Sequence, residues 1–215
     1  MAEKNICPLC EEKLGFFYRG FWSINAPKLL DSAVCEDCHR QLCRLLQFKK
    51  HWIPKDQVNQ NPWRLMKWEH TEEISVTDAK ALFDLRDQLC AAAGQSLGVS
   101  SGNTFVSVQS FRLTPHPPVA IHRVKKLSLK AAVGGLVLRG SFKKGDTVTL
   151  LHQGEILQRE IIELAPCKNG AFKSNECYSM LESNVHKQEL KAGDEGWLLL
   201  DLDGITPDGG VFLMG

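Results

Sequence analysis

Two CxxC pairs near the start of the chain, Cys7 with Cys10 and Cys35 with Cys38, constrain its fold more than any other feature. In each pair the spacing lets two sulfur atoms of one tight turn approach the same metal ion at about 2.3 Å. Two such pairs complete the tetrahedron of ligands that Zn²⁺ prefers. The 24 residues between the pairs slightly exceed the usual spacing, but the cost of closing a loop grows only logarithmically with its length. The sequence therefore predicts a structural zinc site formed by these four cysteines.

A helix is expected to begin at the second pair. Leu42, Leu45 and Leu46 follow Cys38 at helical spacing, which indicates one buried helix face. Cys38 would then lie in the first turn, where the positive end of the helix dipole favours a thiolate. A turn that carries one pair, followed by a helix that carries the other, is the treble-clef arrangement.

His39 and Cys43 are rival ligands beside the second pair. Cys43 lies five residues after Cys38, about 140° further around a helix, so a small buried hydrophobic residue is the simpler interpretation. His39 is expected in solvent, or as a hydrogen-bond donor behind a ligand. A redox dithiol remains an alternative, as does a zinc- or thiol-dependent enzyme that uses Cys35, Cys38, His39 and Cys43. Four cysteine ligands favour a closed, non-catalytic site, because a catalytic zinc usually keeps an open position.

Residues 7 to about 48 resemble small bacterial four-cysteine domains that often begin a multidomain chain. The resemblance rests on CPLC, on the KLGFFYRG that follows it, and on LLDSAVCEDCHRQL. It implies bound zinc and says little about activity.

The stretch from residue 49 to residue 70 interleaves basic residues with tryptophans, and Lys49, Lys50 and Trp52 open it. This mixture is typical of single-stranded nucleic acid binding, because cations follow phosphates and flat rings stack on bases. Packing of the tryptophans against a neighbouring domain is the simpler alternative. Pro54 and Pro62 interrupt any long helix, so we expect a semi-ordered linker with one short helix near residues 63–68.

A longer helix is expected within SVTDAKALFDLRDQLCAAAG, residues 75–94. Thr77 can cap it, Asp78 suits its first turn, and Gly94 can end it. The expected domains are a four-cysteine zinc-binding module over 1–48, a basic and aromatic linker with this helix over 49–103, and a β domain over 104–215.

From Thr104 onward, alternating and β-rich segments predict six or so short strands punctuated by glycine, which implies a closed barrel. A KxGDxxxLL pattern occurs twice, beginning at Lys143 and at Lys191, and its Gly-Asp supplies a turn into a buried strand. The expected fold class is α+β: a small four-cysteine zinc-ribbon or treble-clef module, a short helical linker and a C-terminal six-stranded antiparallel β-barrel.

The order of these motifs resembles the second domain of elongation factor Tu and other translational GTPases. The pattern is met by residues 132–151, with KKGDTVTL, and by residues 192–213, with AGD and ITPDGGVFL. The resemblance implies a barrel that, in translation factors, contacts ribosomal RNA or the charged end of transfer RNA. PHPPVA near residues 115–120 and the stretch from 164 to 191 depart from the pattern. GxxxxGK[ST] does not occur in the chain, so no nucleoside triphosphate is expected as a partner.

Charge in the β domain is polarised along the sequence. Basic residues without acids stand between His116 and Gly145, and acids without bases follow Lys191. One rim of the barrel is thus a candidate RNA surface, whereas a solvated strand face offset by acids of neighbouring strands is the equally simple alternative. The possible nucleic-acid contacts are Lys49, Lys50, Trp52, Arg123, Lys125, Lys126, Lys143 and Lys144.

Composition and the absence of known motifs exclude several classes of protein. A net charge of +1 and a pI near 7.6 exclude a strongly basic or acidic protein. The apolar runs fall short of the ~20 residues that cross a bilayer, so we expect a soluble, cytoplasmic protein without a membrane partner, whose cysteines stay reduced. HExxH, GxSxG and GxGxxG do not occur. The sequence therefore predicts a non-catalytic zinc-binding adaptor that docks protein or RNA through its zinc module and barrel, near the translation machinery by analogy with the family.

Overall fold

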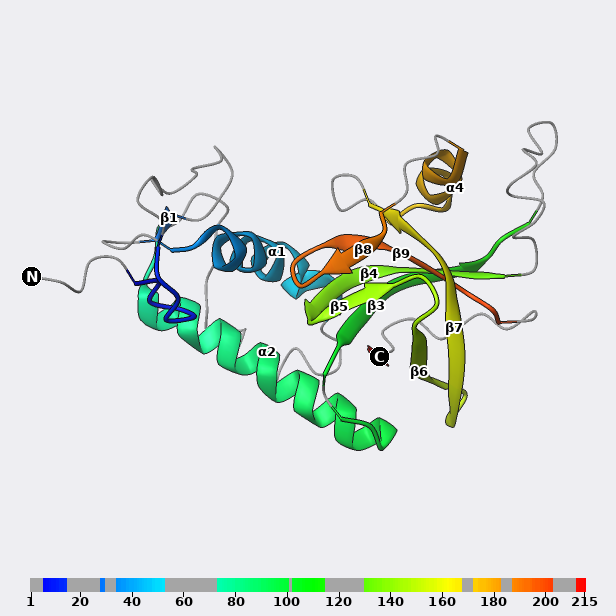
Figure 1. Ribbon diagram of the computed structural model, residues 1–215, viewed down its shortest axis with the longest axis horizontal. Coiled ribbons are helices and arrows are strands. Elements are labelled where there is room, and N and C mark those ends of the chain that lie inside the picture. Colours follow the sequence, from blue (N-terminus) through cyan, green and yellow to red (C-terminus); the bar gives the residue numbers. More distant parts are fainter. Residues whose placement is uncertain are drawn as a thin grey trace, which may run out of the picture. The chain divides into compact units, whose positions relative to one another are not determined.

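The structure is a computed structural model of the chain (Figure 1), and it describes residues 6–14, 28–29, 34–52, 73–100, 102–114, 130–167, 172–182, 187–202 and 212–215. The chain forms two compact units, Met1–Leu89 and Cys90–Gly215. Among the described residues, no helix is both long and apolar enough to cross a membrane.

The first unit contains helix α1 and a short pair of strands. Strand β1, Lys28–Leu29, lies parallel to strand β2, Glu73–Ile74. Helix α1 spans Glu36–Trp52, and Leu42 and Leu45 are buried on it, as their helical spacing predicted. Helix α1 therefore begins between the two cysteines of the second pair.

Helix α2, Val76–Leu97, is capped by a different residue from the one the sequence suggested. Ser75 Oγ accepts the backbone N–H of Asp78 at 3.0 Å and donates to Asp78 Oδ2 at 2.6 Å. Ser75 is therefore the cap, and the prediction of Thr77 is wrong. A cap directly precedes the helix and accepts an N–H group of its first turn, as Ser75 does, whereas Thr77 already lies inside α2.

The C-terminal end of α2 also differs from the expectation. The helix continues through Gly94, because a single glycine inside a helix costs only about 1 kcal/mol. It ends before Gly98, whose φ is +67°. The N–H groups of Gly98 and Val99 return to the carbonyls of Gln95 and Gly94 at 3.3 and 3.0 Å. The left-handed Gly98, and not Gly94, thus ends the helix.

The predicted linker is described only in part. Residues 49–52 belong to α1, so the helix extends into the stretch that we expected to be a linker. The short helix expected near residues 63–68 lies outside the described residues.

The second unit is built on a closed barrel of six strands in the order β10-β3-β4-β9-β7-β6. All neighbouring pairs are antiparallel, so the predicted α+β class with a six-stranded antiparallel barrel is confirmed. The barrel strands are β3 Thr104–Arg112, β4 Ala131–Arg139, β6 Thr147–His152, β7 Glu155–Pro166, β9 Glu195–Leu200 and β10 Phe212–Met214. Helix α4, Ser174–Glu182, follows β7. The strand suggested by residues 120–129 lies outside the described residues.

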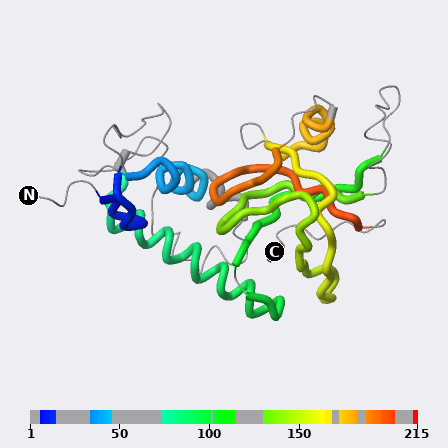
Figure 2. The backbone as a smooth tube through the Cα atoms, in the orientation of Figure 1, coloured from blue at the N-terminus to red at the C-terminus, as the bar shows by residue number. Residues whose placement is uncertain are grey.

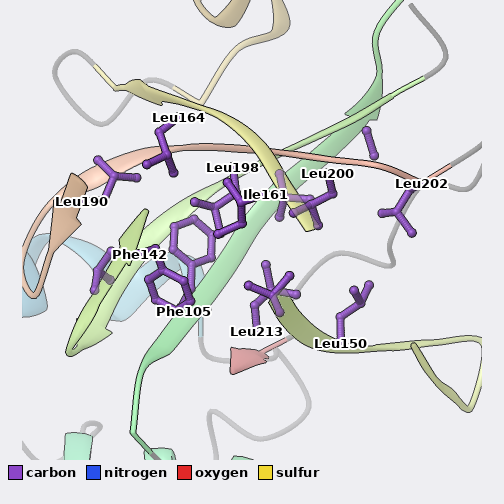
Figure 3. Packing of buried hydrophobic residues seen from close by; sticks show 14 residues of the cluster. Phe105, Phe142, Leu150, Ile161, Leu164, Leu190, Leu198, Leu200, Leu202 and Leu213 are labelled. Atoms are coloured by element: carbon purple, nitrogen blue, oxygen red, sulfur yellow. The ribbon is translucent and has the colours of Figure 1, made fainter. Parts of the chain in front are cut away.

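Hydrophobic side chains from all six strands fill the barrel (Figure 3). Phe105 and Phe142 meet edge to face with their ring centroids 6.0 Å apart. Leu150, Leu198 and Leu213 are fully buried around them. Successive residues of a strand point to opposite faces, but β4 and β9 are buried at almost every position, which explains why their sequences are almost continuously apolar.

The β6–β7 hairpin closes through a tight turn. Gln153 and Gly154 have φ values of +49° and +84°, as a type I′ turn requires. Leu151 pairs with Ile156 across the hairpin, whose course can be followed in Figure 2.

The two KxGD turns have the same hydrogen bonds. Asp146 Oδ2 accepts the N–H of Lys143 at 2.7 Å, and Asp194 Oδ2 accepts the N–H of Lys191 at 3.0 Å. Both glycines have positive φ, +90° at Gly145 and +86° at Gly193. The strands that precede the turns, β5 Ser141–Lys143 and β8 Glu189–Lys191, pair with each other. The repeated motif in the sequence is thus a pair of equivalent turns in space.

Close packing explains a glycine inside strand β4. A Cβ on Gly135 would lie 1.9 Å from the carbonyl oxygen of Val106 and 2.7 Å from the Phe105 ring. Strands β3 and β4 can approach this closely only because Gly135 has no side chain.

Candidate metal centre

The four cysteines of the two CxxC pairs gather at one place in the first unit. The Sγ atoms of Cys7, Cys10, Cys35 and Cys38 all lie within 4.8 Å of one another. Among the described residues, no other group of His, Cys, Asp and Glu side chains gathers in this way. The structure therefore brings together the four residues that the spacing selected.

A tight turn positions the first pair. Cys7 donates its N–H to the carbonyl of Glu12 at 2.8 Å, and its own carbonyl accepts the N–H of Glu11 at 2.9 Å. Glu11 has a φ of +62°, which bends the chain back so that Ile6 and Lys13 form an isolated β-bridge. This knuckle lies near the start of α1 (Figure 1).

The start of helix α1 positions the second pair. Cys35 immediately precedes the helix, and its carbonyl accepts the N–H of His39 at 2.9 Å. Cys38 lies in the first turn, where its N–H donates to Cys35 Sγ at 3.4 Å. Both sulfur atoms thus lie near the positive end of the helix dipole, which stabilises negative charge.

The sulfur geometry fits a zinc ion. With metal–sulfur bonds of about 2.3 Å, the sulfur atoms of a tetrahedral site lie about 3.8 Å apart. Cys10 Sγ and Cys35 Sγ are 3.6 Å apart, and none of the eight cysteines forms a disulfide. A disulfide would instead need about 2.05 Å. Four thiolates in a tetrahedron are the donor set of structural zinc sites.

Burial and hydrogen bonding act in opposite directions on Cys7. Burial raises the pKa of the Cys7 thiol, but N–H groups from the backbone of Cys35, Leu9 and Cys10 outweigh that effect and lower the pKa to about 7. Cys7 is therefore the thiol of this cluster that the surrounding backbone prepares as a thiolate.

The second pair resists ionisation in the absence of a cation. Burial raises the pKa of Cys35 to about 11, against hydrogen bonds from Cys38, and the Cys7 thiolate adds to the increase. Burial, followed by hydrogen bonds with Cys35 and Cys10, raises the pKa of Cys38 further. Only a positive ion at the centre would hold all four sulfurs as thiolates.

His39 and Cys43 do not belong to the four-sulfur cluster. Cys43 Sγ lies 3.8 Å from His39 Nε2, one helical turn away. Burial raises the pKa of Cys43 to about 11, with a smaller opposing effect of Arg44, and burial lowers the pKa of His39. Cys43 is half-buried, and a thiol that stays protonated is not an activated nucleophile.

The possible nucleic-acid contacts are only partly described. Lys49, Lys50 and Trp52 belong to α1, but their side chains lie outside the description. Arg123, Lys125 and Lys126 also lie outside the described residues. The structure therefore places two of the eight side chains, those of Lys143 and Lys144.

These two lysines lie beside carboxylates. Lys143 Nζ is 3.4 Å from Glu189 Oε1, and Lys144 Nζ is 3.8 Å from Glu163 Oε2. Lys191 Nζ reaches the other oxygen of Glu189 at 3.4 Å. A hydrogen bond from Ser141, followed by the charges of Lys143 and Lys191, lowers the pKa of Glu189. For Lys143 and Lys144, acids of other strands thus offset the positive charge, which agrees at these two residues with the alternative interpretation of the charge pattern.

Sequence reasoning did not identify these acidic partners individually. Glu163 is far from Lys144 in sequence, and Glu189 is far from Lys143. Lys130 pairs with the distant Asp201 in the same way. The sequence indicated only that basic and acidic residues are concentrated in different segments. The individual ion pairs depend on which strands become neighbours in the barrel.

Comparison with known proteins finds a distant structural match. No protein-family model matches the chain, and no curated protein does. Among solved structures, translation elongation factor SelB from Methanococcus maripaludis matches with a TM-score of 0.34 and 14% identity over 75% of this chain and 32% of SelB. A bacterial selenocysteine-specific elongation factor, EF-Sec, matches with 0.33 and 13% over 75% and 24%. GDP-bound aIF5B from Aeropyrum pernix matches with 0.32 and 10% over 70% and 23%.

This chain therefore spans about a quarter to a third of the length of these proteins. The similarity to these translation factors is one of structure and is distant.

Proposed function

We propose that this chain is a non-catalytic zinc-binding adaptor that docks a protein partner through its zinc module and its β-barrel. The observation that carries the proposal is the cluster of four Sγ atoms within 4.8 Å of one another. Four thiolates fill the tetrahedral coordination of zinc and leave no position for a water or a substrate. Zinc bound there would stabilise the fold of the module, and the four cysteines would only hold it.

The charge arrangement favours protein over RNA as the partner. The described lysines of the candidate RNA surface, Lys143 and Lys144, face Glu189 and Glu163. Binding to nucleic acid relies on uncompensated cations that replace the counterions of phosphates. Balanced charges of both signs are instead common at the polar rim of protein interfaces.

Two further parts of the proposal rest on the sequence. Eight cysteines that form no disulfide fit a reducing compartment such as the cytoplasm. An association with the translation machinery follows only from the resemblance of the sequence motifs, and the partner would be sought there first.

Capture of partners by the zinc-loaded full chain tests the proposal. The chain is used to capture partners from lysate, with and without nuclease, beside Cys7→Ser and the control Cys43→Ala. We expect one zinc per chain in the wild type and in Cys43→Ala. We also expect a nuclease-resistant set of proteins that Cys7→Ser loses and Cys43→Ala keeps.

Different results would contradict different parts of the proposal. Capture that nuclease abolishes, together with RNA affinity that falls steeply with salt, would assign RNA as the partner. A metal with a water ligand that small anionic inhibitors displace would support the enzyme alternative. Equal capture by all three chains would show that the zinc module does not dock the partner.

A further inference from the structure

The four cysteines of the cluster differ in exposure. Cys7 and Cys38 have 0% and 4% of their surfaces exposed. Cys35 is half-buried, and Cys10 is exposed, alone among the eight cysteines. A dissolved reagent therefore reaches the sulfur of Cys10 first, because oxidation of thiolates is selected by access as well as by charge.

The exposed sulfur is already in contact with a second one. Cys10 Sγ and Cys35 Sγ are 3.6 Å apart, which is van der Waals contact, and they need to approach to about 2.05 Å to form a disulfide. The two come from different CxxC pairs, so a bond between them would join the knuckle to the start of α1. Cys7 and Cys38, the other two ligands, are shielded by the protein.

We infer that the metal centre is a peroxide-sensitive switch in which Cys10 is oxidised first and a Cys10–Cys35 disulfide forms. In the first step the Cys10 thiolate attacks one oxygen of hydrogen peroxide, the O–O bond breaks, and hydroxide leaves. The product is a sulfenic acid at Cys10. In the second step the Cys35 thiolate attacks the Cys10 sulfur, the S–S bond forms, and the S–O bond breaks with loss of a second hydroxide. Two sulfurs supply the two electrons that reduce the peroxide.

The consequence is release of the metal. A disulfide sulfur is a poor ligand, so only Cys7 and Cys38 would remain, which is half the tetrahedron that structural zinc requires. Reduction of the disulfide would restore the site. The inference rests on the proposed zinc binding and adds a condition under which the docking module would be disabled.

Zinc release and disulfide mapping on the full-length, zinc-loaded wild type test the inference. Hydrogen peroxide is added in stoichiometric amounts, and a chromogenic chelator reports free zinc. Trypsin then separates the two pairs, because Lys13, Arg19 and Lys28 lie between Cys10 and Cys35. We expect release of one zinc per chain and a cross-linked pair of peptides whose fragments assign the bond to Cys10 and Cys35. A reducing agent with added zinc should reverse both.

A variant that keeps the metal sharpens the test. Cys10→His retains a Cys₃His donor set, which also binds zinc, but cannot form the disulfide. We expect zinc to remain bound and its release by peroxide to slow roughly tenfold or more, since the first sulfur attacked is missing. Cys167→Ser, which removes a half-buried cysteine of the second unit, is the control and should release zinc at the wild-type rate.

The inference would be overturned by disulfides within either CxxC pair, by a disulfide that includes Cys43, or by release from Cys10→His at the wild-type rate. Zinc that is bound but not released by peroxide would overturn the inference alone. Wild-type protein purified without zinc would overturn the proposed zinc binding as well, so the two failures are distinguishable.

Discussion

The backbone N–H of Cys35 donates a hydrogen bond to the sulfur of Cys7 at 3.4 Å. This bond joins residues 28 positions apart and places the second CxxC pair against the first. It also stabilises the negative form of Cys7, whose pKa is about 7 despite the opposing effect of burial. The protein thus supplies backbone N–H groups that hydrogen-bond to the ligand sulfur, in addition to the four sulfur atoms. Such hydrogen bonds orient metal ligands.

The zinc content of single variants should distinguish the cysteines that bind the metal from residues that only lie near it. We expect one zinc per chain in the wild type, in His39→Ala and in Cys43→Ala, because the last two residues lie outside the four-sulfur cluster. Cys7→Ser and Cys38→Ser should lose the metal, since each removes one of the two buried ligands. Mass spectrometry of the metal content of purified protein checks this. Loss of zinc from Cys43→Ala would show that the ligand set is wrong.

Metal affinity should rise with pH. Cys35, with a pKa of about 11, and Cys38, whose pKa is raised further, are protonated at pH 7 in the metal-free chain. Zinc must displace at least these two protons, so the apparent Kd should fall by about 100-fold or more for each pH unit between 6 and 8. Competition with a chelator of known pH dependence measures the slope. A Kd that does not change with pH would contradict the thiol pKa values.

The cap of α2 should contribute measurably to stability. Ser75→Ala removes the acceptor for the Asp78 N–H and should lower the free energy of unfolding by about 1 kcal/mol. Thr77→Ala is the matched control, because Thr77 is exposed and is not the cap. We expect its effect to stay within about 0.5 kcal/mol. Urea unfolding followed by helical circular dichroism compares the two, and a larger effect of Thr77→Ala would reverse the assignment.

Strand β4 should not tolerate a side chain at Gly135. A methyl group there would meet the Val106 carbonyl oxygen at 1.9 Å, so Gly135→Ala must push β3 and β4 apart and should cost about 2 to 4 kcal/mol. Gly102→Ala adds the same atom where nothing lies within 4 Å and serves as the control. Thermal unfolding measures both. Equal melting temperatures would mean that the two strands are further apart than the structure shows.

The metal centre was predictable because its information is local. The spacing within each CxxC pair predicts a tight turn that brings its two sulfur atoms together. Only the approach of the two pairs to each other had to be inferred. The KxGD turns were predictable for the same reason. Each turn needs a residue with positive φ, and the motif itself supplies a glycine there, Gly145 or Gly193.

Other features depend on tertiary neighbours that the sequence does not name. Ser75 and Thr77 are both acceptable caps by residue type, and only the path of the chain before α2 decides between them. Lys143 finds Glu189 because β5 and β8 become neighbours, although 45 residues separate the two side chains. Charge pairing of this kind requires the strand order, which alternation of hydrophobic residues does not specify.

The barrel does not close equally well all the way around. Strands β3 and β4 share a long ladder, whereas β10 meets β6 at one described residue pair, Met214 with Thr149. Among the described residues, this seam has fewer paired positions than the others, and stability is not uniform across a fold. Local unfolding would therefore begin between β10 and β6. The backbone amides of these two strands would exchange hydrogen for deuterium while the other strand pairs of the barrel stay protected.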